Sequence, residues 1–427
     1  MDLGLERITH VLKALENPQD KVPVVHLAGT NGKGSTCTYL ARLLGGPGWG
    51  ERRVGQFTSP HFLEPRDAIR INGIPIPPGQ YQELHERLMT STEGGEALTS
   101  FEQETAVAFL YFVAMEVDVA LIECGLGGAL DATNVCVQPL LCILTSISLD
   151  HEAILGGTIL EITRAKVGIL RPDVPVVLAH QEEATREVVE GVVRGRAGAL
   201  GCPLYLAPDQ FKDGKGPVPC PLPGKAQEGN LSTALTALSL LPSSLTPDMS
   251  PDRTRRALLG MRWAGRMDVQ SLPPLPAPVL MDGAHNPAGA HALRQALGEE
   301  EPIGWILGLS QGKDVDGMLR ELLRPGDRAI LLGFSIPDGM PWCRCMDPRD
   351  VESRIVSILP SLPTRVFPTK NEKDGMAGRE ERESLVHQAL THASSSFVSH
   401  RPVICGSLYL LADVYRTLGL EAFSPTE

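Results

Sequence analysis

Residues 26–36 read HLAGTNGKGST, and they continue an apolar run, VPVVHLA, that begins at residue 22. This run does not alternate and is rich in valine, which is typical of a strand buried on both faces of a parallel sheet. Behind the glycines, STCTYLARLL at 35–44 has the apolar spacing of an α-helix. The stretch therefore predicts a buried strand, a glycine loop and the start of a helix.

The composition of this loop indicates that it binds an anion. Glycines let backbone N–H groups close around an anion, the helix N-terminus adds partial positive charge, and Lys33 supplies a full charge. The anion that the pattern indicates is the triphosphate of a nucleotide. The spacing departs from G-x-x-x-x-G-K-[ST], because Gly34 is inserted between Lys33 and Ser35. A chance glycine turn is the alternative interpretation.

Length and charge limit the classes of protein to consider. A chain of 427 residues predicts two domains, and 42% hydrophobic residues are ordinary for a soluble globular protein. The formal net charge of −12 argues against nucleic acid as the main partner. An anionic substrate must then be met locally, at places such as Lys33 and Arg266.

The location of the protein can also be predicted from the sequence. The nine cysteines show neither metal-ligand spacing nor the density of a disulfide scaffold, which indicates a reducing compartment. No apolar run of about 18 residues occurs, and MDLGLERITHVL at 1–12 carries acids where a signal or transit peptide would not. We therefore expect a cytoplasmic protein without membrane contact, with a mitochondrial location as the alternative.

Apolar runs alternate with helical patterns from residue 22 to about residue 180, which predicts a doubly wound, mostly parallel sheet. The stretch QSLPPLPAPVLMDGAHNP, from residue 270, holds four prolines before an apolar strand, as an interdomain linker would. We place the domain boundary near residue 270. Short strands separated by helices follow and predict a second α/β unit.

Polar residues stand at the ends of several predicted strands, where open α/β sheets bind ligands. Ser59 follows one apolar run, Glu123 ends another, and Asp150 and His151 end a third. Oxygen ligands from Ser59 and Glu123 suit Mg²⁺, which keeps waters and binds through few carboxylates plus phosphates. A solvated cap is the alternative for any single one of these residues, but three such ends beside one phosphate loop favour a metal–nucleotide site.

Seven motifs together resemble the folylpolyglutamate synthase and dihydrofolate synthase family, relatives of the Mur ligases. In chain order they are HLAGTNGKGST, FTSPH, ECGLGGALDATN, SLDH, AKVGI, WAGRM and MDGAHNP. The resemblance covers nearly the whole chain. It implies a Mur-ligase-like, parallel-sheet P-loop ATPase domain at 1–270 and a smaller Rossmann-like α/β domain at 271–427. The family joins the amino group of glutamate to a carboxylate on a pterin-bearing substrate, using ATP and forming an acyl phosphate.

The resemblance implies the following site residues. ATP is bound by Thr30, Asn31, Gly32, Lys33, Gly34, Ser35, Asn230, Arg266 and Asp282. Magnesium, for which we expect two ions, is bound by Ser59, Glu123, His151 and Lys166. Lys33, Lys166 and His285 are the catalytic residues, and no organic prosthetic group is expected.

Two of these assignments have a clear chemical sense. The resemblance implies that Lys166 is carried as a carbamate, an anion on a long arm that can ligate a second Mg²⁺ where an ammonium would repel it. The alternative is a plain surface lysine in a helix. The resemblance also implies that His285 faces the reaction centre, and it is a candidate to position or accept a proton of the glutamate amine, because the reference pKa of histidine is near neutrality.

Segments that resemble a dihydropteroate pocket favour dihydrofolate synthase activity. The pocket residues are Asp2, Leu3, Gly4, Leu5, Phe101, Glu102, Leu130, Asp131 and Ala132. The family also suggests a monomer whose partners are small molecules. Ala68 and Ala129 stand where family members often carry arginine, and both losses remove positive charge. These two alanines suggest one alternative, a non-catalytic nucleotide-binding homologue. A folylpolyglutamate synthase, which differs only in its acceptor, is the other alternative.

Overall fold

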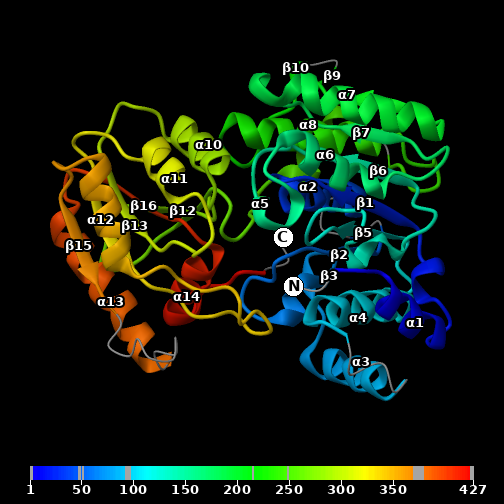
Figure 1. Cartoon of the computed structure of the whole chain (residues 1–427), viewed down its shortest axis with the longest axis horizontal. Coiled ribbons are helices and arrows are strands. Elements are labelled where there is room, and N and C mark those ends of the chain that lie inside the picture. The colour runs from blue at the N-terminus through cyan, green and yellow to red at the C-terminus, as the bar shows by residue number, and fades with distance from the viewer. Residues whose placement is uncertain are drawn as a thin grey trace.

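The structure is a computed structural model that describes residues 3–46, 50, 52–91, 98–213, 216–247, 250–368 and 379–423. Two α/β units lie side by side, as Figure 1 shows. We call residues 3–258 the N-terminal unit and residues 268–423 the C-terminal unit. The α/β class and the predominance of parallel strands, both predicted from the sequence, are confirmed.

The N-terminal unit is built on a sheet with the strand order β4-β3-β2-β5-β1-β6-β7-β8. Neighbouring strands from β2 to β8 run parallel, whereas β3 and β4 form an antiparallel edge. The predicted strand after residue 22 is β1 in the middle of the sheet, and all of its residues are buried. The strands of the unit are β1 (Val24–Ala28), β2 (Val54–Phe57), β3 (Ile69–Ile71), β4 (Ile74–Pro75), β5 (Val119–Glu123), β6 (Leu141–Leu144), β7 (Val176–Leu178), β8 (Leu204–Leu206), and the hairpin β9 (Lys212–Asp213) and β10 (Gly216–Pro217).

Helices cover both faces of this sheet. α2, α8 and α9 pack on the face to which β1 contributes Val25 and Leu27, and α1, α4, α6 and α7 pack on the other face. The helices are α1 (Glu6–Ala14), α2 (Lys33–Gly45), α3 (Pro78–Thr90), α4 (Ser100–Ala114), α5 (Glu152–Leu155), α6 (Ile159–Lys166), α7 (Glu183–Leu200), α8 (Lys225–Leu238) and α9 (Pro251–Leu258), with the 3-10 helices η1 (Pro18–Asp20), η3 (Pro65–Ala68), η5 (Ala132–Val135) and η6 (Val167–Ile169).

The C-terminal unit has a second sheet with the order β11-β12-β16-β13-β14-β15, parallel except for β11 at one edge. α10, α11 and α12 cover one face, and α13 and α14 cover the other. Its elements are β11 (Asp268–Gln270), β12 (Val279–Asp282), β13 (Ile303–Leu307), β14 (Arg328–Leu332), β15 (Thr364–Phe367), β16 (Arg401–Cys405), α10 (Pro287–Leu297), α11 (Val315–Leu322), α12 (Pro348–Ile358), α13 (Arg379–Ser396) and α14 (Leu408–Leu418).

The proline-rich stretch after residue 270 differs from the linker that the sequence predicts. β11 lies before the prolines and pairs antiparallel with β12 after them, so the stretch connects two strands of one sheet. Prolines are tolerated there because β11 is an edge strand and the loop lies outside the ladder. The chain passes between the sheets earlier, in the segment between α9 and β11. The division of the chain at residue 270 itself stays a prediction.

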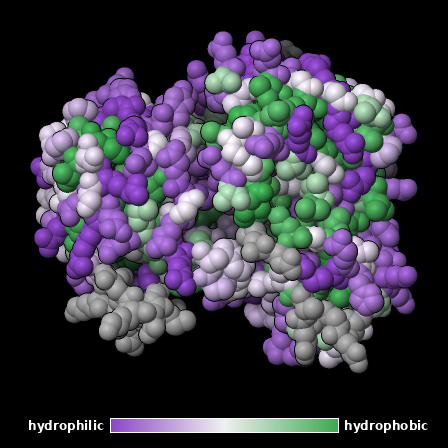
Figure 2. Space-filling view, viewed as in Figure 1, coloured by the Kyte–Doolittle hydropathy of each residue, from purple (hydrophilic) through white to green (hydrophobic). Residues whose placement is uncertain are grey.

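The two units are held against each other by apolar packing. One hydrophobic cluster runs from α2 and α8 to buried residues of the second sheet such as Trp305 and Leu307. In Figure 2, polar side chains predominate along the boundary between the units, and larger hydrophobic areas lie over the N-terminal unit. Of the helices that the structure describes, none combines the length and hydrophobicity that crossing a bilayer would require.

Candidate active site

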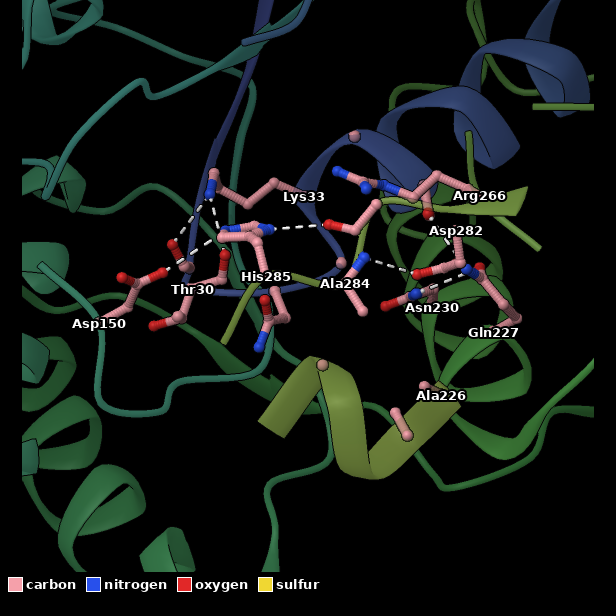
Figure 3. A pocket seen from close by; sticks show the side chains of 18 of the residues that line it. Thr30, Lys33, Asp150, Ala226, Gln227, Asn230, Arg266, Asp282, Ala284 and His285 are labelled. Atoms are coloured by element: carbon pink, nitrogen blue, oxygen red, sulfur yellow. Dashed lines mark hydrogen bonds and ion pairs between the residues drawn. The ribbon is translucent and has the colours of Figure 1, made fainter. Parts of the chain in front are cut away.

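A cavity of about 190 Å³ opens between the two units, at the carboxyl ends of the strands of the first sheet. In Figure 3, Lys33, Asp150 and His285 lie on one side of it, and Arg266, Asp282 and Asn230 lie on the other. Site residues predicted from motifs far apart in the chain all line this one cavity: Thr30, Asn31, Gly32, Lys33, Gly34, Ser35, Ser59, Glu123, His151, Lys166, Asn230, Arg266, Asp282 and His285.

The glycine loop joins β1 to α2. Gly32 precedes the helix with φ of 85°, a conformation that favours glycine, and a Cβ at this position would collide with the side chain of Asn230. The backbone N–H of Thr30 donates to the carbonyl of Ser146 after β6, at 2.8 Å. The first N–H groups of α2 have no partner within the helix, so the loop presents donors to an anion.

The Lys33 ammonium lies over its own loop. Nζ donates to the carbonyl oxygens of Gly29 and Thr30, each at 3.2 Å, and lies 3.7 Å from Oε1 of Glu123. The side chain is mostly buried, so these contacts act in a partly desolvated space. Two carbonyls and one carboxylate carry less negative charge than a triphosphate. The position of Lys33 is therefore suited to binding phosphate groups.

Glu123 ends the buried strand β5, and its carboxylate turns into the cavity. Oε2 accepts a hydrogen bond from the backbone N–H of Ser59 at 3.3 Å, which ties the ends of β2 and β5 together. Burial raises the pKa of Glu123, and the nearby charges of Lys33 and Arg266 oppose that shift. A cation beside this buried carboxylate would stabilise its charged form.

Lys166 lies at the end of α6 and is only 4% exposed, so it is not the surface lysine of the alternative interpretation. Its Nζ donates to the carbonyl of Gly29 at 2.7 Å. Burial, together with the charge of Lys33, lowers the pKa of Lys166 to about 7. The amine therefore lies behind the phosphate loop with its charge disfavoured.

Asp150, of the N-terminal unit, is bonded to residues of the C-terminal unit at the cavity. Its carboxylate accepts a hydrogen bond from Lys313 Nζ at 2.5 Å and another from Asn286 Nδ2 at 3.1 Å, both from the C-terminal unit. His285 Nε2 lies 3.7 Å from Oδ2 of Asp150. Burial alone would raise the pKa of Asp150, but His285 and Lys313 hold it well below its usual range.

His285 has a defined ring orientation. Its Nδ1 lies 2.8 Å from the carbonyl of Gly283, which can only accept, so Nδ1 carries the proton of the neutral ring. Nε2 is then the basic nitrogen, and it faces the cavity beside Asp150. His151 differs: its side chain is 42% exposed, and desolvation at the site, together with the charges of Lys313 and Lys33, lowers its pKa against the opposing charge of Asp150.

Asp282 and Arg266 form the opposite wall. Asp282 ends β12 and accepts hydrogen bonds from the backbone N–H groups of Met267 at 2.9 Å and Ala284 at 2.8 Å, so it fixes two loops of the site. Arg266 lines the cavity at intermediate exposure, beside Gly283. Asn230, on α8, donates to Gln227 at 3.3 Å. These groups offer both charge and hydrogen bonds to a nucleotide.

The predicted magnesium ligands supply only part of the coordination shell that the ion needs. Ser59 and Glu123 offer oxygen atoms at adjoining strand ends, and His151 and Lys166 line the same cavity. Within the described ranges, no group of three or more His, Cys, Asp or Glu side chains is placed to hold a metal by itself. Mg²⁺ usually takes few protein ligands plus waters and phosphates, so this donor set fits a nucleotide-bound ion.

The predicted acceptor residues in the described part of the chain lie together, and none of them is among the residues that line this cavity. α1, α4 and η5 pack on one another, and Leu5, Phe101 and Ala132 share one hydrophobic cluster. Leu130 is exposed at 55%. Leu3 and Gly4 precede α1, and Asp2 lies outside the described residues. The assignment of these residues to the acceptor stays a prediction.

Two of the predicted acceptor residues have structural partners. Glu102 caps α4 by accepting from the N–H of Thr99 at 2.8 Å, and it pairs with Arg7 of α1 at 3.2 Å. Asp131 accepts from the backbone N–H groups of Leu126 at 2.7 Å and Thr133 at 3.0 Å. These bonds fix the shape of the segments that carry Phe101 and Leu130.

The two alanines that replace arginines have different surroundings. Ala68 is 1% exposed within an apolar cluster and is not among the residues that line the cavity. Ala129 is partly exposed, and its N–H donates to the carbonyl of Ala165, next to Lys166, at 2.9 Å. Alanine in place of arginine at residue 129 therefore removes a positive charge close to the segment that carries Lys166.

Sequence reasoning missed Lys313 and Asn286, and it noted Asp150 without a role. Asn286 and Asn31 exchange side-chain hydrogen bonds at 3.2 and 3.3 Å, which joins the phosphate loop to the start of α10. Lys313 follows β13, so its position at a strand end was a signal that could have found it. The pairing with Asp150 required the two units to be placed.

Comparison with known proteins finds relatives that agree with one another in their described function. Residues 265–417 match the family model described as dihydrofolate synthetase, C-terminal domain. The dihydrofolate synthetase of Saccharomyces cerevisiae is 35% identical, covering 97% of this chain and 98% of the relative. The probable dihydrofolate synthetase of Schizosaccharomyces pombe is also 35% identical, covering 99% of each.

Solved structures of similar fold cover almost the whole chain. Folylpolyglutamate synthase of Mycobacterium tuberculosis, complexed with ADP and AMPPCP, is 28% identical with a TM-score of 0.78, over 98% of this chain and 96% of that one. FolC of E. coli, in complex with DHPP and ADP, is 26% identical with a TM-score of 0.76, over 98% and 94%.

Proposed function

This chain belongs to the dihydrofolate synthase and folylpolyglutamate synthase family of ATP-dependent ligases, and from that premise we propose its reaction. The proposed reaction joins L-glutamate to 7,8-dihydropteroate and gives 7,8-dihydrofolate, ADP and phosphate through an acyl phosphate. The observation that carries the proposal is that one cavity gathers the phosphate loop and Glu123 of the N-terminal unit with Asp282 and His285 of the C-terminal unit.

The first step activates the acceptor carboxylate. A carboxylate is a poor electrophile, and transfer of the γ-phosphoryl group from ATP gives an acyl phosphate with a good leaving group. Lys33 neutralises charge on the β- and γ-phosphates, and Gly32 and Gly34 leave room for backbone N–H groups to approach them. Asn230, Arg266 and Asp282 complete the nucleotide site from the opposite wall.

Ser59, Glu123, His151 and Lys166 are the residues that would hold magnesium. The ion supplies Lewis-acid neutralisation of the phosphate oxygens when it is bound. Glu123 suits this place because its buried carboxylate already faces the ammonium of Lys33 at 3.7 Å. Two ions, as the resemblance implies, would need an anion at residue 166.

The second step is attack of the glutamate amine on the acyl phosphate. The ammonium must lose a proton, and Nε2 of His285 is the basic nitrogen that faces the cavity. Asp150 lies beside it at 3.7 Å and would stabilise the imidazolium that forms. The new amide bond forms as the phosphate leaves. Because His285 and Asp282 come from the second unit, the site is complete only when both units face each other.

Lys166 carries a prediction of its own, that its amine is carbamylated. The neutral amine adds CO₂, a C–N bond forms and one proton is released, which converts a buried cation beside Lys33 into an anion. Activity of the wild type should then fall several-fold when CO₂ and bicarbonate are stripped from the buffer. Lys166→Ala should regain part of its activity with a short added carboxylate, and its residual activity should not respond to CO₂. An unmodified Lys166 in the mass spectrum of active, metal-loaded protein kept in bicarbonate would contradict this prediction.

The experiment that tests the proposed function is release of phosphate by the purified protein. Phosphate should appear only when ATP, L-glutamate and dihydropteroate are all present, and dihydrofolate should form in equal amount. Absence of release with any pterin acceptor would instead support a non-catalytic nucleotide-binding homologue. Cytoplasmic location, a monomeric state and independence from nucleic acid and membranes stay predictions drawn from the sequence.

A further inference from the structure

A loop of the C-terminal unit reaches the N-terminal unit beside the predicted acceptor segments. We call residues 335–346, between β14 and α12, the 335–346 loop. Figure 1 shows it as a long yellow-orange excursion from the C-terminal unit toward the region of β3 and α4. A Cβ placed on Gly339 would lie 3.3 Å from the Cβ of Ser100, the first residue of α4. The loop therefore touches the helix that carries Phe101.

A line of contacts connects this loop to the reacting centre. Glu123 and Gly125 line the cavity between the units, and the ring of Phe101 covers Gly125 so closely that a Cβ there would lie 2.7 Å from it. Ser100 precedes Phe101, and Gly339 lies against Ser100. A molecule whose carboxylate lies at Glu123 and Lys33, and whose rings extend outward past Phe101, would reach the 335–346 loop.

The loop is held in shape at both ends. The N–H of Ser335 donates to Asp413 at 2.7 Å, and the N–H of Met346 donates to Leu309 at 2.7 Å. Within the loop, consecutive turns bond Met340 to Pro337 at 3.1 Å and Cys343 to Met340 at 2.9 Å. These bonds fix the backbone of the segment that carries Trp342.

Trp342 is the unusual residue in this loop. Its side chain is 56% exposed, whereas Trp305 of the same unit is fully buried. An exposed indole offers an aromatic plane, and flat heterocycles stack on such planes.

We propose that Trp342 is a specificity-determining residue that stacks on the pterin ring of the acceptor, with the 335–346 loop as the outer wall of the acceptor site. This inference rests on the proposed function, because it takes the carboxylate end of the acceptor to lie at Glu123 and Lys33. It assigns one ring-binding element to the C-terminal unit, which otherwise contributes Asp282 and His285 to the inner cavity.

Steady-state kinetics test this role. Trp342→Ala should raise KM for dihydropteroate about tenfold, as expected for loss of one aromatic stacking partner, with KM for ATP unchanged. Trp342→Phe should recover most of the loss because it keeps an aromatic plane. Val398→Ala, which removes a 79% exposed apolar side chain elsewhere in the same unit, is the matched control and should match the wild type. An unchanged KM for dihydropteroate in Trp342→Ala would overturn the inference.

A binding measurement separates this inference from the proposed reaction. Pteroate, a stable pterin acid, should quench the tryptophan fluorescence of the wild type more than that of Trp342→Phe, because the other tryptophans are common to both proteins. Equal quenching in the two proteins would overturn the stacking role. If turnover of dihydropteroate failed while the difference in quenching remained, the proposed function would fall and the pterin-binding role of Trp342 would stand.

Discussion

Lys33→Ala should lower kcat for ligation by on the order of a thousandfold, because no other cation of the loop can neutralise the β- and γ-phosphates. Among the described residues, Lys33 Nζ donates to the carbonyls of Gly29 and Thr30 and lies 3.7 Å from Glu123, so its charge is available to ATP. Phosphate release with saturating substrates measures the loss. ATP should also raise the unfolding temperature of the variant less than that of the wild type, since bound ligand stabilises the folded state.

The matched control is Lys13→Ala, which removes an exposed lysine from α1 and should leave turnover unchanged. It separates the effect of the loop from that of one unit of charge on the protein surface. Near-normal kcat in Lys33→Ala would mean that the glycine loop serves only as a turn, the alternative interpretation of its sequence.

Glu123→Gln is the second change with a large expected effect, a fall of about a hundredfold in kcat. The amide keeps the size of the side chain but removes the negative charge at the end of β5, beside Lys33 and Ser59. Excess Mg²⁺ should restore activity at most in part, because the site has lost the carboxylate that suits the ion. Initial rates measured over a magnesium titration give both the fall in kcat and the extent to which Mg²⁺ restores it.

The stability of Glu123→Gln provides an independent readout. Burial raises the pKa of Glu123 in the folded protein, so ionisation disfavours the fold, and that cost grows as the pH rises above the pKa of the unfolded chain. Without metal at pH 7, the glutamine variant should therefore unfold at a temperature no lower than the wild type. Glu116→Gln, exposed just before the same strand, is the control. Full activity in Glu123→Gln would remove this residue from the mechanism.

Much of the nucleotide site could be predicted because its residues are local in sequence. The run VPVVHLA is buried and parallel in the sheet because valines fill both faces, and Gly32 and Lys33 follow it directly. Strand ends in a parallel sheet meet at one edge, so Ser59, Glu123 and His151 could be placed together from their positions after apolar runs. These inferences need only short-range pattern and one rule of topology.

Other features depend on how the two units meet, which no local pattern encodes. The pair of Asp150 and Lys313 joins residues 163 positions apart, and the contact of Gly339 with Ser100 likewise crosses the units. The prolines after residue 270 resembled a linker because an edge-strand loop and a linker share the same composition. The burial of Lys166 was hidden for a different reason: it packs within the N-terminal unit, against the carbonyl of Gly29, and a single lysine at the end of a helix carries no signal of what covers it.

The measurement that tests the central claim most directly is competition between acceptors. The purified protein is given ATP, Mg²⁺ and L-glutamate with equal concentrations of dihydropteroate and tetrahydrofolate, and the glutamylated products are resolved by mass spectrometry. We predict that dihydrofolate forms faster than glutamylated tetrahydrofolate at every early time point. Faster glutamylation of tetrahydrofolate would contradict the account and make the protein a folylpolyglutamate synthase.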